Sequence, residues 1–325
     1  MTVLFPANLA SLEAALVAGL AAVEKQLRDE IKSDYELADI TARHLVEAGG
    51  KRFRPLMVLL AAQFGDPTAK GVVPSAVVVE LTHLATLYHD DVMDEATVRR
   101  GTESANSRWG NTVAILSGDF LFARSSKILA DLGPEAVRIQ AQTFERLVIG
   151  QLRETTGPKP GEDPVAHYLE VLAGKTGSLI AAAGRYGALM SGVNPELTER
   201  IAQFGENIGI AFQLSDDLLD IKSNNSGKTP GKDLREGIKT LPVLLALADP
   251  STTPQLRQLL SGPITDDNDH GLALAQLREH RAMDKANDVL LDWVSKAREL
   301  LSDFPEGEPK AALHVLCDSI VDRDI

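Results

Sequence analysis

The sequence predicts an all-α protein, a helical bundle that forms a single domain over residues 1–325. Three observations support this fold class. Apolar residues recur at helical spacing through most of the chain, and short segments rich in Gly, Pro and Asp separate these stretches. Neither the alternation of a strand nor the rhythm of a βαβ unit is convincing in any segment. A hydrophobic content of 44% supplies enough apolar side chains for a large core.

The first helix is expected to be an amphipathic helix of a soluble protein. The segment before it, Met1–Pro6, carries no positive charge, and Glu13 and Glu24 interrupt the apolar stretch that follows. A secretory leader needs a basic start, and a membrane span needs a longer uninterrupted apolar run. We therefore predict neither a leader nor a membrane span. The apolar stripe of this helix consists of Leu12, Leu16, Leu20, Val23, Leu27 and Ile31.

Glycine and proline residues mark the ends of the other helices. A glycine pair closes the helix over residues 35–48, as expected of a glycine C-cap. Pro55, Pro74 and Pro164 each start a helix, because proline fits the first turn. A loop is predicted over 251–270, and the segments after it are typical of charged amphipathic helices. The expected helices before this loop cover residues 35–48, 55–64, 74–94, 112–132, 134–155, 164–174, 179–190, 195–221 and 241–248.

Charge and cysteine content exclude several classes of protein. The net charge is −13 and the isoelectric point is about 5.0, whereas nucleic-acid binding requires a basic surface. An anionic substrate would have to be bound by a local cluster of cations. The single cysteine, Cys317, excludes an internal disulfide and indicates a reducing, cytoplasmic location.

Two D-D-x-x-D motifs are the most informative feature of the chain. Each lies at the end of an apolar helical stretch, so the first and last aspartates of a motif project from one face. Two unit charges about 4 Å apart repel by roughly 4 kcal/mol at an effective dielectric constant of about 20. A cation must therefore stabilise each motif, and an all-oxygen ligand set favours Mg²⁺, which also binds phosphate oxygens. The motifs consist of Asp90, Asp91 and Asp94, and of Asp216, Asp217 and Asp220.

Cations accompany both acidic motifs along the chain. Three of them are compressed into a turn between two helices, which is typical of a helix C-cap and equally of a cradle for an anion. The basic segment 222–232 follows the second acidic motif, and we predict that it forms a mobile lid over a phosphate. The cations and their polar neighbours are Lys51, Arg52, Arg54, Arg99, Arg100, Lys175, Thr176, Lys228 and Lys232.

Together and in this order, the motifs resemble those of the all-trans isoprenyl diphosphate synthases, from the first helix to near the C-terminus. The shared motifs are G-G-K-x-x-R-P, the first aspartate-rich motif with R-R-G, a K-T pair, the second aspartate-rich motif and a G-K-D segment. The resemblance implies the isoprenoid synthase type of helical bundle around a central cavity, and a homodimer. It also implies Mg²⁺ as cofactor, with about three ions bound with the allylic diphosphate.

The resemblance assigns roles to individual residues. Direct contact with Mg²⁺ is expected of Asp90, Asp94 and Asp216, with support from Asp91, Asp217 and Asp220. Isopentenyl diphosphate is expected to be bound by Lys51, Arg54, His83 and Arg100. The allylic diphosphate is expected to be bound by Arg99, Lys175, Thr176, Gln213 and Lys232. The residues expected to carry catalysis are Asp90, Asp94, Asp216, Arg99 and Lys175.

The expected reaction is ionisation of the allylic diphosphate, attack by isopentenyl diphosphate and loss of a proton. Product length should depend on the helix wall below the first acidic motif. In the resembled family bulky aromatics at this place give short products, whereas here Ala85 and Thr86 leave the path of the tail open. Tyr88 projects from another side of the helix. Each turn of about 5.4 Å accommodates about one prenyl unit, so we predict roughly 30 to 50 carbons, a length that suits a quinone side chain.

Other functions remain open at this point. A geranylgeranyl or farnesyl diphosphate synthase would have the same motifs and a shorter product. A non-catalytic regulatory subunit of a heteromeric prenyl synthase would usually have eroded aspartate motifs, and both are intact here. A class I terpene cyclase would not need the second diphosphate site that Lys51, Arg54 and Arg100 supply.

Overall fold

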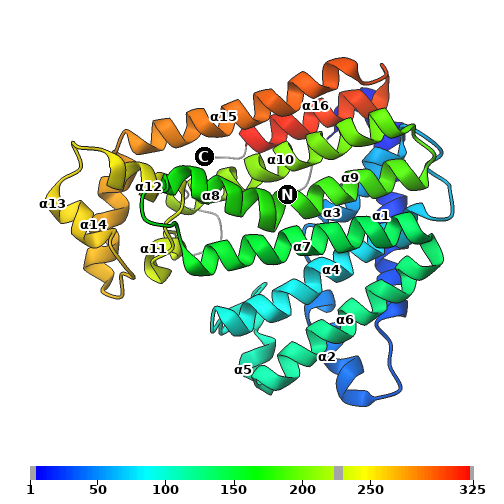
Figure 1. Cartoon of the computed structure of the whole chain (residues 1–325), viewed down its shortest axis with the longest axis horizontal. Coiled ribbons are helices and arrows are strands. Elements are labelled where there is room, and N and C mark those ends of the chain that lie inside the picture. The colour runs from blue at the N-terminus through cyan, green and yellow to red at the C-terminus, as the bar shows by residue number, and fades with distance from the viewer. Residues whose placement is uncertain (1–4, 223–229, 323–325) are drawn as a thin grey trace. The chain divides into compact units, whose positions relative to one another are not determined.

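The computed structural model describes residues 5–222 and 230–322 (Figure 1). It confirms the all-α prediction, because the only sheet within these two stretches is a hairpin of two-residue strands. The predicted helices are confirmed to within a few residues at their ends. The longer helices are α1 (Ala10–Glu30), α2 (Glu36–Glu47), α3 (Phe53–Ala62), α4 (Val72–Met93), α6 (Asn111–Leu132), α7 (Pro134–Thr156), α8 (Pro164–Leu172), α9 (Ser178–Met190), α10 (Pro195–Lys222), α12 (Leu241–Ala248), α14 (Asp267–Arg278), α15 (Ala282–Leu300) and α16 (Glu308–Val321).

The prediction of a loop over 251–270 was wrong in part. A short helix, α13 (Pro254–Leu259), lies inside it, and α14 already begins at Asp267. The side chain of Thr253 caps α13 by accepting a hydrogen bond from the Leu256 N–H at 3.2 Å, and Pro254 occupies its first position. A helix of six residues is too short for apolar periodicity to reveal it, so only this cap could have indicated it.

The hairpin directly follows the first acidic motif. Strand β1 (Val98–Arg99) pairs antiparallel with β2 (Thr102–Glu103). The two residues between the strands, Arg100 and Gly101, have positive φ angles of 54° and 77°, as the two central residues of a type I′ turn require. The sequence prediction of no strand missed this hairpin, because two-residue strands show no alternation. The turn fixes the places of Arg99 and Arg100 close to the end of α4.

The helices group into two compact units. The first comprises the described residues of 1–145, 179–205 and 304–313, and the second those of 146–178, 206–303 and 314–325. In the first unit α4 packs against α1, α3 and α6, and most of its side chains are buried. Figure 1 shows α2, α4, α5 (Ala105–Trp109) and α6 of this unit together, in agreement with the contacts that α6 makes with the other three. The first acidic motif therefore ends the central helix of this unit.

In the second unit α12 packs against α8 and α15, while α14 contacts α11 (Lys232–Glu236) and α13. The second acidic motif lies in the last two turns of α10. A π-helical segment, η2 (Ala173–Gly177), joins α8 to α9 and contains the predicted Lys-Thr pair. Such a segment inserts an extra residue into a helical turn and is often found at functional sites.

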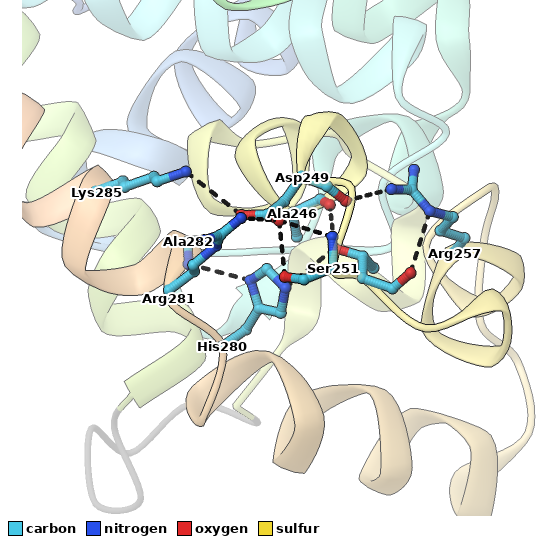
Figure 2. A network of polar contacts seen from close by, with 9 residues as sticks. Ala246, Asp249, Ser251, Arg257, His280, Arg281, Ala282 and Lys285 are labelled. Atoms are coloured by element: carbon cyan, nitrogen blue, oxygen red, sulfur yellow. Dashed lines mark hydrogen bonds and ion pairs between the residues drawn. The ribbon is translucent and has the colours of Figure 1, made fainter.

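A buried carboxylate fixes the turn after α12 in the second unit (Figure 2). The side chain of Asp249 is fully buried and accepts hydrogen bonds from Arg281 through both oxygens. It also accepts from the backbone N–H and the hydroxyl of Ser251, at 2.9 and 2.8 Å, and Lys285 Nζ lies 3.4 Å away. These donors, Arg281 first, hold the pKa of Asp249 well below its usual range. The network thus joins the end of α12 to the start of α15.

One segment of the described residues, Ala7–Glu30, is long and apolar enough to cross a membrane by length and composition. A mostly buried core helix of a soluble protein and a signal sequence near the N-terminus pass the same test, and 22% of the most apolar window of this segment is buried. The buried part includes Leu12, Leu16 and Leu27 of the predicted apolar stripe, where α1 packs against α3 and α4 in the first unit.

Candidate active site

The first acidic motif occupies the C-terminal end of α4. Asp90 is half-buried, Asp94 is exposed and follows the last residue of the helix, and Asp91 is fully buried. The C-terminal end of a helix carries a partial negative charge, so three carboxylates at this place are unfavourable for the helix itself. Their position indicates a binding role rather than a contribution to stability.

Asp91 is held in the first unit by Arg99 of the hairpin. Its Oδ1 accepts a hydrogen bond from Arg99 Nε at 2.6 Å, while its buried Oδ2 has no hydrogen-bond partner. Burial raises the pKa of Asp91, and the neighbouring Arg99 opposes this shift. The prediction that Asp91 supports the motif, rather than being its exposed ligand, agrees with this geometry. Since Arg99 Nε already donates to Asp91, the predicted binding of a diphosphate by Arg99 would use its two Nη nitrogens.

One face of α4 is partly accessible. His83, Thr86, Leu87 and Asp90 are half-buried and follow the spacing of a single helix face, whereas Ala85 on the adjoining face is fully buried. The predicted path along Thr86 therefore lies on the accessible face. The predicted small wall residue Ala85 packs against α6, where its carbonyl oxygen lies 3.0 Å from the point that a Cβ of Gly118 would occupy.

The basic turn before α3 contains one structural cation and two candidate ligands. Arg52 is buried in the left-handed backbone region with a φ of 47°, and it forms ion pairs with Glu24 and, at 2.7 Å, with Glu80. Lys51 is exposed. Arg54 is half-buried, and its buried Nε has no hydrogen-bond partner. A buried donor without a partner is costly, and a bound anion would satisfy it.

Arg100 extends this basic cluster from the hairpin. Its guanidinium donates to the backbone carbonyl groups of Leu45, at 3.0 Å, and Gly49, and its Nη2 lies 3.8 Å from Glu80. Glu80 is only 2% exposed and so provides the buried negative charge between Arg52 and Arg100. Sequence reasoning missed Glu80. A charged residue within the apolar run before the first motif was the available signal, since a fully buried glutamate is almost always paired.

His83 lies among these cations on the accessible face of α4. Burial, followed by the positive charges of Arg54 and Arg100, lowers the pKa of His83 well below its ordinary value. Burial also lowers the pKa of Arg54 to about 10, with Glu80 opposing the shift and Arg100 adding to it. Arg54 is thus still charged at neutral pH, while His83 is neutral and can donate one hydrogen bond.

The second acidic motif has the same division of roles within its own unit. Asp217 is 2% exposed, whereas Asp216 and Asp220 are half-buried. The hydroxyl of Tyr168 donates to Asp217 Oδ2 at 2.5 Å, and Gln213 Nε2 lies 3.4 Å from the other oxygen. Burial raises the pKa of Asp217 to about 8, although the hydrogen bond from Tyr168 opposes this shift. Sequence reasoning missed Tyr168, because its position in the chain gave no sign of this contact.

Asp220 accepts hydrogen bonds from the N-terminal end of α11. Its two carboxylate oxygens accept hydrogen bonds from the backbone N–H groups of Lys232 and Asp233, at 3.2 and 3.1 Å. The exposed side chain of Lys232 pairs with Glu236 at 3.1 Å. Most of the predicted lid over 222–232, including Lys228, lies outside the described residues.

The Lys-Thr pair lies in η2, where α7 approaches closely. A Cβ on Gly150 of α7 would come within 2.7 Å of the Lys175 backbone nitrogen, so only glycine permits this packing. Lys175 Nζ pairs with Glu154 of α7 at 2.5 Å, while Thr176 is half-buried. The ion pair with the glutamate thus fixes the position of the lysine side chain.

Within residues 5–222 and 230–322, no group of three or more acidic, His or Cys side chains is already arranged to hold a metal ion. Mg²⁺ is usually bound by one or two carboxylates together with waters and substrate phosphates, so it does not need a complete protein cage. Paired accessible aspartates and the buried Asp91 oxygen without a partner fit an ion that binds together with a diphosphate.

Comparisons with known proteins agree with these features. The sequence profile of the polyprenyl synthetase family matches residues 36–276. The chain is 49% identical over 314 residues to the nonaprenyl diphosphate synthase of Mycobacterium tuberculosis, which covers 95% of this chain and 94% of that protein. A crystal structure of geranylgeranyl pyrophosphate synthase from Corynebacterium glutamicum, complexed with calcium and isoprenyl diphosphate, matches with a TM-score of 0.86 and 44% identity over 96% and 97% of the chains. A decaprenyl diphosphate synthase from Rhodobacter capsulatus matches with a TM-score of 0.86 and 33% identity over 97% and 99%.

Proposed function

Because the chain belongs to the polyprenyl synthetase family, we propose that it condenses isopentenyl diphosphate with an allylic diphosphate to give a long-chain all-trans polyprenyl diphosphate. The single observation that carries this proposal is the pair of D-D-x-x-D motifs, each with one buried, hydrogen-bonded aspartate and accessible partners. The identity to a nonaprenyl diphosphate synthase supports the long product. A geranylgeranyl or farnesyl diphosphate synthase is the second candidate, favoured by the similarity to the C. glutamicum enzyme.

The allylic diphosphate is bound by both acidic motifs and by nearby cations. Mg²⁺ ions, when bound, neutralise the charge that develops on the leaving diphosphate. Arg99, Lys175 and Lys232 add positive charge to the same group and so favour cleavage of the allylic C–O bond. The Thr176 hydroxyl and the Gln213 carbonyl turn their oxygen dipoles toward the resulting cation. The residues that hold the metal are Asp90, Asp94 and Asp216, supported by Asp91, Asp217 and Asp220.

Isopentenyl diphosphate occupies the basic cluster of the first unit. Lys51, Arg54 and Arg100 bind its diphosphate, and neutral His83 donates a hydrogen bond to it. Its double bond attacks the allylic cation, one C–C bond forms, and the departing diphosphate accepts the proton that is lost. No protein nucleophile takes part.

This function is tested by incubating the purified protein with isopentenyl diphosphate, Mg²⁺ and a series of allylic primers, and by sizing the products. We expect elongation to roughly 30 to 50 carbons, as about one prenyl unit per helix turn implies. Products that stop at about 15 or 20 carbons would support the shorter-chain synthase. No elongation with any primer would support the regulatory subunit.

Product length provides a separate prediction. Thr86→Phe should shorten the main product by at least one prenyl unit, because a ring on the accessible face of α4 would block the tail about one turn below Asp90. Ala85→Phe should also shorten the product, but Ala85 is fully buried, so the larger side chain would overpack the core and destabilise the protein as well. The expectation that Tyr88 projects from another side of the helix was wrong with respect to Ala85, because residues three apart share a face and both are fully buried. Tyr88 is still not the block, since its hydroxyl donates to the Thr41 carbonyl of α2. An unchanged product distribution in both variants would contradict the proposed path.

We further propose that the enzyme is a cytoplasmic homodimer and that its product becomes the side chain of a quinone. The single buried cysteine fits a reducing compartment, and burial raises the pKa of its thiol to about 12. Gel filtration with light scattering tests the dimer.

A further inference from the structure

We propose that Tyr168 is a positioning residue for the second acidic motif: its hydroxyl orients the Asp217 carboxylate and thereby fixes the face of α10 that presents Asp216. Tyr168 itself touches no substrate in this scheme. The inference rests on the proposed function, because it gives the second motif its role as a metal and diphosphate site.

The contact has the geometry of a strong, directed hydrogen bond. The Tyr168 hydroxyl lies 2.5 Å from Asp217 Oδ2, and the carboxylate is almost completely buried. A separation of 2.5 Å is at the short end of the range for an O–H···O hydrogen bond. Tyr168 keeps its proton, since burial raises its pKa well above the ordinary value. The amide of Gln213, at 3.4 Å from the other oxygen, is the weaker partner.

Tyr168 also connects two elements of the second unit that the proposed function uses together. It lies on α8, about two helical turns before Lys175 in η2, while Asp217 lies on α10. One hydroxyl therefore fixes the relative position of the helix that carries the Lys-Thr pair and the helix that carries Asp216. The partners of ligands are known to tune metal sites in this way without contacting the ion.

The test is Tyr168→Phe, which removes one oxygen and keeps the ring. We expect the Mg²⁺ concentration for half-maximal activity to rise by roughly tenfold, the lower end of the effects seen when a group that orients a metal site is lost. KM for the allylic diphosphate should rise with it, while KM for isopentenyl diphosphate stays within about twofold, since that substrate is bound elsewhere. Calorimetry with inorganic pyrophosphate and Mg²⁺ should show a similar loss of affinity without any turnover.

Tyr186→Phe is the matched control. Tyr186 is fully buried, whereas Tyr168 is half-buried, and it likewise donates its hydroxyl to an oxygen, the Ala136 carbonyl at 2.9 Å within the first unit. Both variants should lose thermal stability, but only Tyr168→Phe should change Mg²⁺-dependent pyrophosphate binding. The inference is overturned if Tyr168→Phe binds like the wild type, if both variants lose affinity equally, or if the wild type shows no Mg²⁺-dependent binding. Failure of the proposed function is a different result, namely wild-type protein that binds Mg²⁺-pyrophosphate and elongates no primer.

Discussion

Asp90→Asn and Asp216→Asn are each expected to lower kcat by at least about a hundredfold, because each removes a negative charge that holds the metal against the leaving diphosphate. Asparagine keeps the size and a carbonyl oxygen, so the helices α4 and α10 should remain folded. Single-turnover assays at saturating substrates measure the effect directly. Asp292→Asn is a suitable control, since this aspartate of α15 is exposed and pairs with Lys296 in its own helix. Its kcat should stay within about twofold of the wild type.

The double variant, with Asp90→Asn and Asp216→Asn combined, tests whether the two motifs bind one diphosphate. If they do, adding the second substitution should lower kcat much less than the same substitution does in the wild type, because the effects of residues that act as a unit are strongly non-additive. Fully additive losses in kcat would contradict a shared substrate, even if both single variants are inactive.

Glu80→Gln is expected to lower the free energy of unfolding by about 3–5 kcal/mol, because it leaves Arg52 and Arg100 near an uncharged partner in a buried place. Glu80 is 2% exposed and Arg52 is 8% exposed, so water cannot replace the missing charge. Urea denaturation followed by circular dichroism measures the loss.

Glu24→Gln is the comparison for Glu80. Glu24 pairs with the same Arg52, but its side chain is 29% exposed, so the loss should be only about 1 kcal/mol. An equal loss in the two variants would contradict the view that burial of Glu80 is the decisive factor. We also expect KM for isopentenyl diphosphate to rise in Glu80→Gln, since Arg54 and Arg100 would lose their common neighbour.

The sequence predicted the helices and the accessible aspartates because both depend on local spacing. Asp90 and Asp94, or Asp216 and Asp220, share a helix face wherever the helix lies, so their pairing needs no tertiary information. The partners of the intervening aspartates could not be predicted equally well. Arg99 is eight positions from Asp91, but Tyr168 is 49 positions from Asp217, and nothing in its neighbourhood marks it as a donor.

The roles of the cations in the basic turn before α3 could not be predicted from the sequence either. The sequence identified three cations in this turn and left open whether they cap a helix or bind an anion. The structure gives Arg52 a structural role, since its partners Glu24 and Glu80 neutralise it, and leaves the buried Nε of Arg54 without a partner. Only the fold could separate these neighbouring residues, because the pairing depends on α1 and α4.

Because η2 is π-helical, the number of residues between α8 and α9 determines how the side chains on the two helices are oriented relative to each other. Each residue of an α-helix turns the chain by about 100°, so a further residue inserted within 173–177 would rotate everything on one side of it by about that amount. Lys175 and Tyr168 could then no longer both face their present partners, Glu154 and Asp217. Substitutions in this segment change single contacts, whereas a change in its length would alter the register between the two helices.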